Sequence, residues 1–147
     1  MYDSMAAADA DAVMVTQGWF LSAVPRPPWG EKQARAFLHG PPHGKLLVLD
    51  LNAIANPVWS RTKSFYGTPF ALSMLHNFGE RPGLFGRMPE LVVDPPRALA
   101  NSVPGSDVGL GMTPEGARPC GACLRFCVLF MFVGFCFFCV LHYYILV

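Results

Sequence analysis

The chain has 147 residues, enough for one domain of ordinary size, and its eleven Lys and Arg against ten Asp and Glu give a net charge of +1. This near neutrality, with no basic face and no run of arginines, argues against a nucleic-acid-binding protein. Residues 1–12 are acidic and rich in Ala, without the basic and apolar regions of a secretory signal, so we expect them not to direct the chain into the secretory pathway.

The amino half is predicted to alternate helices and strands. Residues 6–12 are predicted to be the end of a helix that leads into a strand near 13–17. A proline-rich connection follows, and residues 31–38 have the composition of a helix that stops at a Gly-Pro pair. A second strand is predicted near 46–51, because a continuous apolar run is typical of strands buried on both faces.

The alternation continues in the second half with less regular connections. Residues 56–67 are predicted to form a long loop, and 69–74 a short helical turn before a strand near 74–78. Four prolines make a single long helix unexpected over residues 83–97, and the last strand is predicted near 108–112. Strands that alternate with helical segments indicate an α/β fold with a parallel sheet.

Each predicted strand ends in polar or aromatic side chains. In a parallel β/α barrel the carboxyl ends of the strands face the active site. We therefore expect part of an active-site rim, in which Asp50, His76 and Glu115 converge at one edge of the sheet. The residues at these ends are Gln17, Trp19, Asp50, Asn52, His76, Asn77 and Glu115.

The two carboxylates at this edge leave alternatives open. A carboxylate at the position of Glu115 can attack an anomeric carbon, but its Pro-Glu-Gly context by itself favours a surface turn. Asp50 interrupts an apolar run and is predicted to point toward a polar centre, either as a structural anchor or as a catalyst. The two would form a self-sufficient retaining pair only if they lay about 5–5.5 Å apart.

The sequence argues against a metal site and against a disulfide framework. No second His or Cys lies at ligand spacing from His76. The pairs Cys120/Cys123 and Cys136/Cys139 have almost wholly apolar surroundings, whereas a zinc ribbon needs polar turns around its thiolates. The five cysteines are odd in number and all follow Gly116.

Residues 118–147 differ in kind from the rest. The stretch 126–147 has no formally charged side chain and is long enough to cross a hydrocarbon core of roughly 30 Å, with Arg118 and Arg125 on its amino side. It is predicted to be either a membrane anchor or a mistranslated segment, and we favour the second because its residues have thymine-rich codons. The first would make the chain a small membrane-anchored, non-enzymatic interaction protein.

Six stretches together resemble the barrel domain of the α-N-acetylglucosaminidases, the lysosomal exo-glycosidases of glycoside hydrolase family 89. The most specific are Met74-Leu-His-Asn-Phe-Gly79 and Gly111-Met-Thr-Pro-Glu-Gly116, and the likeness covers about residues 5–116. The resemblance implies that residues 1–117 are part of a (β/α)8 TIM barrel with about four parallel strands, followed by the apolar segment. It reverses the local interpretation of Glu115.

The resemblance also implies an activity. The family removes terminal α-linked N-acetylglucosamine from heparan sulfate with retention, by two glutamates and no cofactor, so Glu115 is expected to be the nucleophile. Substrate contacts are implied for Gln17, Trp19, Asp50, His76 and Asn77. The general acid/base belongs to an Asn-Glu-Met motif that this sequence does not contain, so the chain is expected to be inactive alone.

The sequence departs from the family at two positions after the second predicted strand. Asn52 replaces the usual Phe, and Ile54 stands where the family usually has a carboxylate at the rim. Substrate contacts are therefore not carried over to these two positions.

Overall fold

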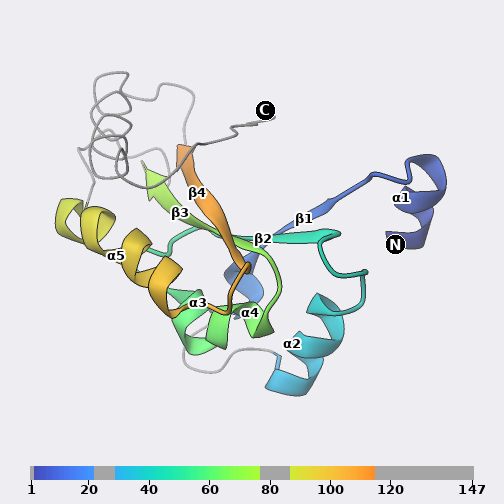
Figure 1. Ribbon diagram of the computed structural model, residues 1–147, viewed down its shortest axis with the longest axis horizontal. Coiled ribbons are helices and arrows are strands. Elements are labelled where there is room, and N and C mark those ends of the chain that lie inside the picture. The colour runs from blue at the N-terminus through green and yellow to red at the C-terminus, as the bar shows by residue number, and fades with distance from the viewer. Residues whose placement is uncertain (1, 22–28, 77–86, 115–147) are drawn as a thin grey trace.

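The computed structural model describes residues 2–21, 29–76 and 87–114 (Figure 1). The four strands form one parallel sheet in the order β1-β2-β3-β4, which confirms the predicted α/β fold. The helices and strands are α1 (Tyr2–Ala8), β1 (Met14–Gln17), the 3-10 turn η1 (Gly18–Leu21), α2 (Glu31–Leu38), β2 (Leu46–Asp50), α3 (Val58–Arg61), α4 (Lys63–Tyr66), β3 (Phe70–His76), α5 (Met88–Asn101) and β4 (Asp107–Pro114).

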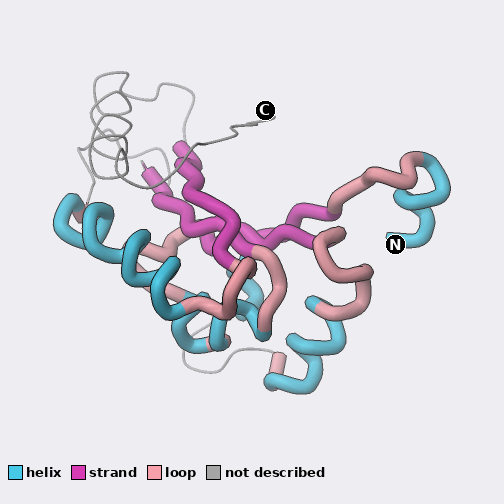
Figure 2. Tube along the Cα trace, viewed as in Figure 1, coloured by secondary structure: helices cyan, strands magenta, loops and turns pink. Residues whose placement is uncertain are grey.

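The main core lies between the sheet and a layer of helices. Helices α2 to α5 lie on one side of the sheet, and α1 stands apart beyond β1 (Figures 1 and 2). Alternate strand side chains point into this layer, since successive side chains of a strand face opposite ways. The buried cluster joins Met14, Leu46, Val48, Phe70 and Leu72 of the strands to Ala34, Leu38, Val58, Trp59 and Ala98 of the helices.

The predicted helical turn before β3 is wrong, because β3 already begins at Phe70. Every residue from Phe70 to Leu75 is buried, and the strand pairs with β2 on one side and β4 on the other. A central strand that is covered on both faces shows no alternation of polar and apolar residues. The small residues Ala71 and Ser73 also interrupt its apolar run, so the sequence indicates only the second half of the strand.

The expectation that no long helix forms near residues 83–97 is also wrong. Helix α5 spans 14 residues and contains Pro95 and Pro96 in its interior. A proline there removes a backbone hydrogen bond and disturbs the preceding turn. Leu91 and Ala98 are buried on either side of the prolines, so packing of this face offsets the lost hydrogen bonds.

The predicted loop 56–67 contains two single-turn helices, of which α4 is left-handed. Its four residues have φ between 49° and 60°, although none is a glycine. Left-handed backbone costs about 1–2 kcal/mol per residue for L-amino acids. Two hydroxyls hold the turn, since Thr62 Oγ1 accepts a hydrogen bond from Phe65 N and Ser64 Oγ accepts one from Val103 N, both at 3.1 Å.

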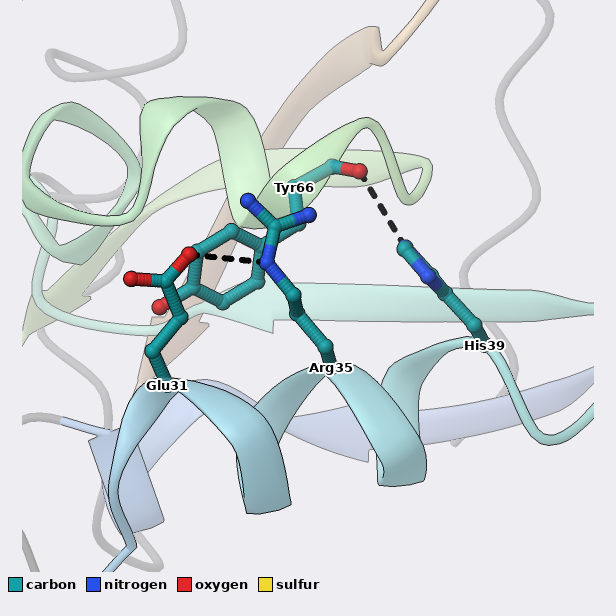
Figure 3. Close-up of polar contacts among 4 residues, drawn as sticks. All are labelled: Glu31, Arg35, His39 and Tyr66. Carbon is teal, nitrogen blue, oxygen red and sulfur yellow. Dashed lines mark hydrogen bonds and ion pairs between the residues drawn. The ribbon is translucent and has the colours of Figure 1, made fainter.

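Helix α2 fixes the last residue of this turn from the other side (Figure 3). The Arg35 guanidinium lies 4.1 Å from the centre of the Tyr66 ring and pairs with Glu31 at 2.8 Å. His39 Nε2 donates a hydrogen bond to the Tyr66 carbonyl at 3.1 Å. The left-handed turn therefore depends on tertiary contacts rather than on local preference.

The strain in α4 gives a testable expectation. We expect Lys63→Gly to raise the free energy of unfolding by about 1 kcal/mol, because glycine adopts positive φ without steric cost. The same substitution at Lys32, an exposed residue inside the right-handed helix α2, should lower it by about 1 kcal/mol. Urea titrations of both variants test the difference, and a loss of stability at both positions would contradict it.

Candidate active site

All four strands point the same way, so their carboxyl ends share one edge of the sheet. β1 ends at Gln17, β2 at Asp50, β3 at His76 and β4 at Pro114. The backbone of His76 pairs with that of Pro114, the residue that precedes Glu115 in the sequence. Glu115 and Asn77 lie outside the described residues, so their predicted places at this edge stay predictions.

The strand ends at this edge are staggered. Gln17 pairs with Leu49, whereas Asp50 pairs with Leu72, four residues before the end of β3. At roughly 3.3 Å per residue, the backbone of Asp50 lies about 13 Å behind that of His76 along the strand direction. Asp50 and His76 thus share an edge but lie at different depths.

Asp50 faces the helix layer rather than the opposite face of the sheet. It follows Leu46 and Val48 in the strand alternation, and it is 2% exposed. Its Oδ2 accepts hydrogen bonds from Val58 N and Trp59 N, each at 2.9 Å. N–H groups in the first turn of a helix have no acceptor within the helix, and the Asp50 carboxylate supplies one for these two. Asp50 therefore anchors α3 to the end of β2.

Burial changes the acidity of this carboxyl. Desolvation raises the pKa of Asp50 to about 6, against the opposing effects of the two backbone hydrogen bonds and of the Arg61 charge. The folded state therefore holds the proton more tightly than the unfolded chain does. Of the two open interpretations of Asp50, the hydrogen bonds support the structural anchor.

This pKa predicts a pH dependence of stability. Because the folded pKa lies above the unfolded value of 3.8, stability should fall as pH rises from about 4 to 6, by about 3 kcal/mol in total. Asp50→Asn should flatten this slope, because the amide oxygen can still accept the α3 hydrogen bonds but does not titrate. Asp11→Asn, at a fully exposed carboxylate, should leave the slope intact. Urea titrations between pH 4 and 7 measure it, and an unchanged slope in Asp50→Asn would contradict the assignment.

The segment Gln17-Gly18-Trp19 connects β1 to η1 beside Asp50. Gln17 is exposed and Trp19 is 36% exposed, so both are accessible at the rim. A Cβ at Gly18 would lie 3.3 Å from the Leu49 carbonyl oxygen and 3.4 Å from the Phe65 ring. A larger residue at this position would therefore require the β2 backbone or the Phe65 ring to shift by a few tenths of an ångström.

A small cavity of about 10 Å³ lies at this edge, enough for roughly one water molecule. Its wall includes the polar residue Asn56, which was not among the predicted site residues, although its place in the connection after β2 was a usable signal. At this edge, the described residues thus form one surface of the candidate site but do not enclose a cavity large enough for a sugar. The cavity is lined by Gly18, Trp19, Asp50, Leu51, Asn52, Asn56 and Val58.

The larger cavities lie away from the carboxyl edge. One of about 540 Å³ lies at the amino ends of β2 and β3, next to His39 and Tyr66, and one of about 410 Å³ lies between α4 and the end of α5. In barrels, residues at the amino-terminal face contribute to stability, whereas the carboxyl face carries the chemistry. The carboxyl edge therefore remains the candidate site.

The structure explains why position 54 carries an isoleucine rather than the carboxylate that is usual in the family. Its side chain is buried and packs with Met74 and Leu91 in a second, smaller core cluster. The position expected to carry a rim carboxylate is thus part of the apolar core beneath α5.

Two further features concern metals and membranes. Within residues 2–21, 29–76 and 87–114, no three His, Cys, Asp or Glu side chains lie close enough together to hold a metal ion. None of the helices in these ranges is long and apolar enough to cross a bilayer.

The segment 126–147, predicted from its sequence to be an anchor or a mistranslated segment, lies outside the described residues.

The chain is similar to known proteins over most of its length. The family model for the alpha-N-acetylglucosaminidase (NAGLU) TIM-barrel domain matches residues 1–124. Human alpha-N-acetylglucosaminidase is 50% identical over 116 residues, which are 79% of this chain and 15% of the human protein.

Solved structures of a Clostridium perfringens family 89 glycoside hydrolase have the same fold. One, with two glutamates replaced by glutamine and its substrate GlcNAc-alpha-1,4-galactose bound, has a TM-score of 0.63 at 32% identity and matches 87% of this chain and 13% of its own. A second, bound to 2-acetamido-1,2-dideoxynojirmycin, also has a TM-score of 0.63 at 32% identity, over 88% of this chain and 13% of its own. The chain thus spans about 13–15% of the length of these relatives.

Proposed function

Because the chain belongs to the alpha-N-acetylglucosaminidase family and forms four parallel strands of its TIM-barrel domain, we propose that it contributes the nucleophile-bearing wall of a retaining exo-glycosidase. The substrate of that enzyme is a glycan that ends in α-linked N-acetylglucosamine, of the heparan sulfate type. The family resemblance extends this proposal to an acidic, lysosomal compartment, where a neutral Asp50 would favour the folded state.

The observation that carries the proposal is the shared edge of the parallel strands. The ends of β1 and β3 and the residue before Glu115 all lie at the edge where barrel enzymes place their catalytic groups. The bacterial relative of this fold was solved with GlcNAc-alpha-1,4-galactose, named there as its substrate. In the proposal, the carboxylate of Glu115, which directly follows β4 in the sequence, attacks the anomeric carbon of such a sugar.

The proposed reaction has two steps. The Glu115 carboxylate attacks the anomeric carbon while a second carboxyl, from another part of the barrel, protonates the glycosidic oxygen as the carbon–oxygen bond breaks. Water, deprotonated by that second group, then attacks the glycosyl ester and releases Glu115 and a sugar of retained configuration. Two inversions at one carbon account for the retention.

The remaining site residues have supporting roles in this proposal. Gln17, His76 and Asn77 supply polar contacts to the sugar, and Trp19 offers an aromatic face at the rim. Asp50 acts mainly on the protein side, because its hydrogen bonds to α3 fix the turn that carries Asn52 and Asn56.

The experiment compares the 147-residue chain with a longer barrel that restores the Asn-Glu-Met segment. The chain alone should hydrolyse aryl α-N-acetylglucosaminides no faster than background. It lacks acid assistance, which contributes about 10²–10⁴-fold, and the positioning walls, which contribute roughly 7–11 kcal/mol. The longer protein should release the α-anomer first, as seen by proton NMR. Turnover by the chain alone that depends on Glu115, or release of the β-anomer, would contradict the proposal.

A further inference from the structure

The cavity of about 410 Å³ between the left-handed turn α4 and the end of α5 has a lining that the proposed active site does not use. The carboxyl end of α5 lies beside α3 and α4 (Figure 1). In the chain, α4 lies between β2 and β3, and α5 lies between β3 and β4, so both walls belong to consecutive connections of the same sheet. The cavity is lined by Trp59, Ser60, Lys63, Ser64, Arg97, Asn101 and Val103.

This cavity presents positive charge and hydrogen-bond donors. Lys63 and Arg97 each bring a cation, and no carboxylate is among the lining residues. Ser64 is 2% exposed, and its Oγ accepts a hydrogen bond from Val103 N, while its hydroxyl proton has no acceptor among the described residues. Trp59 is 5% exposed, and within the same residues its indole N–H has no acceptor either. A cavity with such a lining is suited to an anion that carries several oxygen atoms.

The guanidinium of Arg97 is held in place by a nearly buried carboxylate. Its Nη2 lies 2.9 Å from Oδ1 of Asp94, one turn earlier on α5, and the Asp94 side chain is 9% exposed. This pair uses only part of the guanidinium, whose five N–H donors form a rigid fork. The side chain of Arg97 is half exposed, so its remaining donors are accessible to a ligand. Because Asp94 balances the charge of Arg97, Lys63 supplies the net positive charge of the site.

The backbone of Lys63 also indicates a role for its side chain. Lys63 has φ of 49°, in the left-handed region where a glycine would avoid the steric cost. Strained residues of this kind cluster at binding and catalytic sites, where the surrounding contacts fix them. The Lys63 ammonium has no ion-pair partner among the described residues. A lysine at this strained position is explained if its charge binds a ligand.

We propose that this cavity binds a sulfate group of an acidic glycan. The oxygen atoms of a sulfate group accept hydrogen bonds from several donors at once, and its charge complements that of Lys63. The choice of sulfate rests on the proposed function, whose substrate is a glycan of the heparan sulfate type. Ser64 and Val103 lie shortly before β3 and β4 begin, at the opposite end of the strands from the carboxyl edge. The cavity therefore holds a part of the glycan other than its terminal sugar.

The indole of Trp59 makes binding at this place observable. Its Nε1 has almost no exposed surface, so a sulfate oxygen reaches it only as the walls of the cavity move apart. A buried donor without an acceptor is destabilising, and the acceptor that the ligand brings offsets part of the cost of this movement.

The first test is a calorimetric titration of the 147-residue chain with a sulfated hexasaccharide of the heparan type. The hexasaccharide ends in a uronic acid, so it offers no terminal N-acetylglucosamine to the proposed active site. We expect the dissociation constant to rise by about tenfold or more in Lys63→Gln, because a charge-assisted hydrogen bond is lost. Lys32→Gln removes the same charge from the exposed surface of α2 and should leave the dissociation constant unchanged. Urea titrations should show both variants folded.

Two further ligands identify the group that is bound. The unsulfated hexasaccharide and inorganic sulfate should each bind about tenfold more weakly than the sulfated hexasaccharide, or less tightly still. Equal binding of the unsulfated sugar would assign recognition to the uronic acids, and equal binding of inorganic sulfate would indicate a site for a free anion. Either result would overturn the proposal, as would an absence of binding or equal weakening by Lys63→Gln and Lys32→Gln.

The second test locates the ligand by NMR of the indole N–H groups in the ¹⁵N-labelled chain. The hexasaccharide should shift the resonance of Trp59, which is identified by its loss in Trp59→Phe, and leave those of Trp19 and Trp29 in place. A shift confined to Trp19 would place the glycan at the carboxyl edge, and an unshifted Trp59 would rule out this cavity. Neither test measures turnover, so a longer barrel without glycosidase activity would contradict the proposed function and leave these results standing.

Discussion

Replacing Glu115 by Ala in the longer family barrel should lower kcat/KM for aryl α-N-acetylglucosaminides by roughly 10⁴-fold or more, with little change in substrate binding. The reason is that no other group of the proposed site can form the glycosyl ester, and loss of a nucleophile removes a stabilisation that exists only in the transition state. Steady-state kinetics of the purified variant provide the measurement.

A control and a rescue separate chemistry from misfolding. Glu31→Ala, on the exposed surface of α2 where Glu31 pairs with Arg35, should leave kcat/KM unchanged. Azide should restore turnover in Glu115→Ala and give a glycosyl azide of inverted configuration, because a small anion can take the place of the missing carboxylate. A Glu115→Ala variant that keeps most of its activity would remove Glu115 from the mechanism.

Replacing Asp50 by Ala should lower the free energy of unfolding by about 2–4 kcal/mol at neutral pH. Two buried N–H groups at the start of α3 lose their acceptor, and each unsatisfied donor costs roughly 1–3 kcal/mol. Relief of the desolvation that raises the pKa of Asp50 offsets part of this loss. Urea unfolding of the chain measures the difference, with the exposed Asp11→Ala as the control.

The pH dependence of this loss distinguishes an anchor from a general packing defect. Below about pH 4 the wild-type carboxyl is neutral and its desolvation penalty is absent, whereas the alanine variant does not titrate. The gap between wild type and Asp50→Ala should therefore widen by about 3 kcal/mol between pH 7 and pH 4. A gap that stays constant, or narrows at low pH, would show that Asp50 does not act through the raised pKa.

The sequence predicted the sheet better than it predicted the connections. β1 and β2 lie within one residue of their predicted ends and β4 extends its prediction by one or two, because their apolar runs are bounded by turn residues. β3 was missed over its first half, since a strand buried on both faces without β-branched residues has no period to detect. α5 was missed because its packing overrides the effect of Pro95 and Pro96.

The candidate site could be predicted only as far as the strand ends. That Asp50 lies at the carboxyl edge follows from the apolar run before it, but its direction toward α3 depends on a helix that the sequence presented as a loop. The left-handed turn at residues 63–66 has no local signal beyond Gly67, because contacts from α2 and Val103 hold it. The role of Glu115 rests on the family motif.

The most direct test of the central claim is to trap the glycosyl-enzyme intermediate in the longer barrel that includes this chain. A fluorinated N-acetylglucosamine donor that slows the second step should leave one sugar covalently bound, and peptide mass spectrometry should locate it on Glu115. A sugar attached to another residue, or a reaction with no covalent intermediate and an inverted product, would contradict the account.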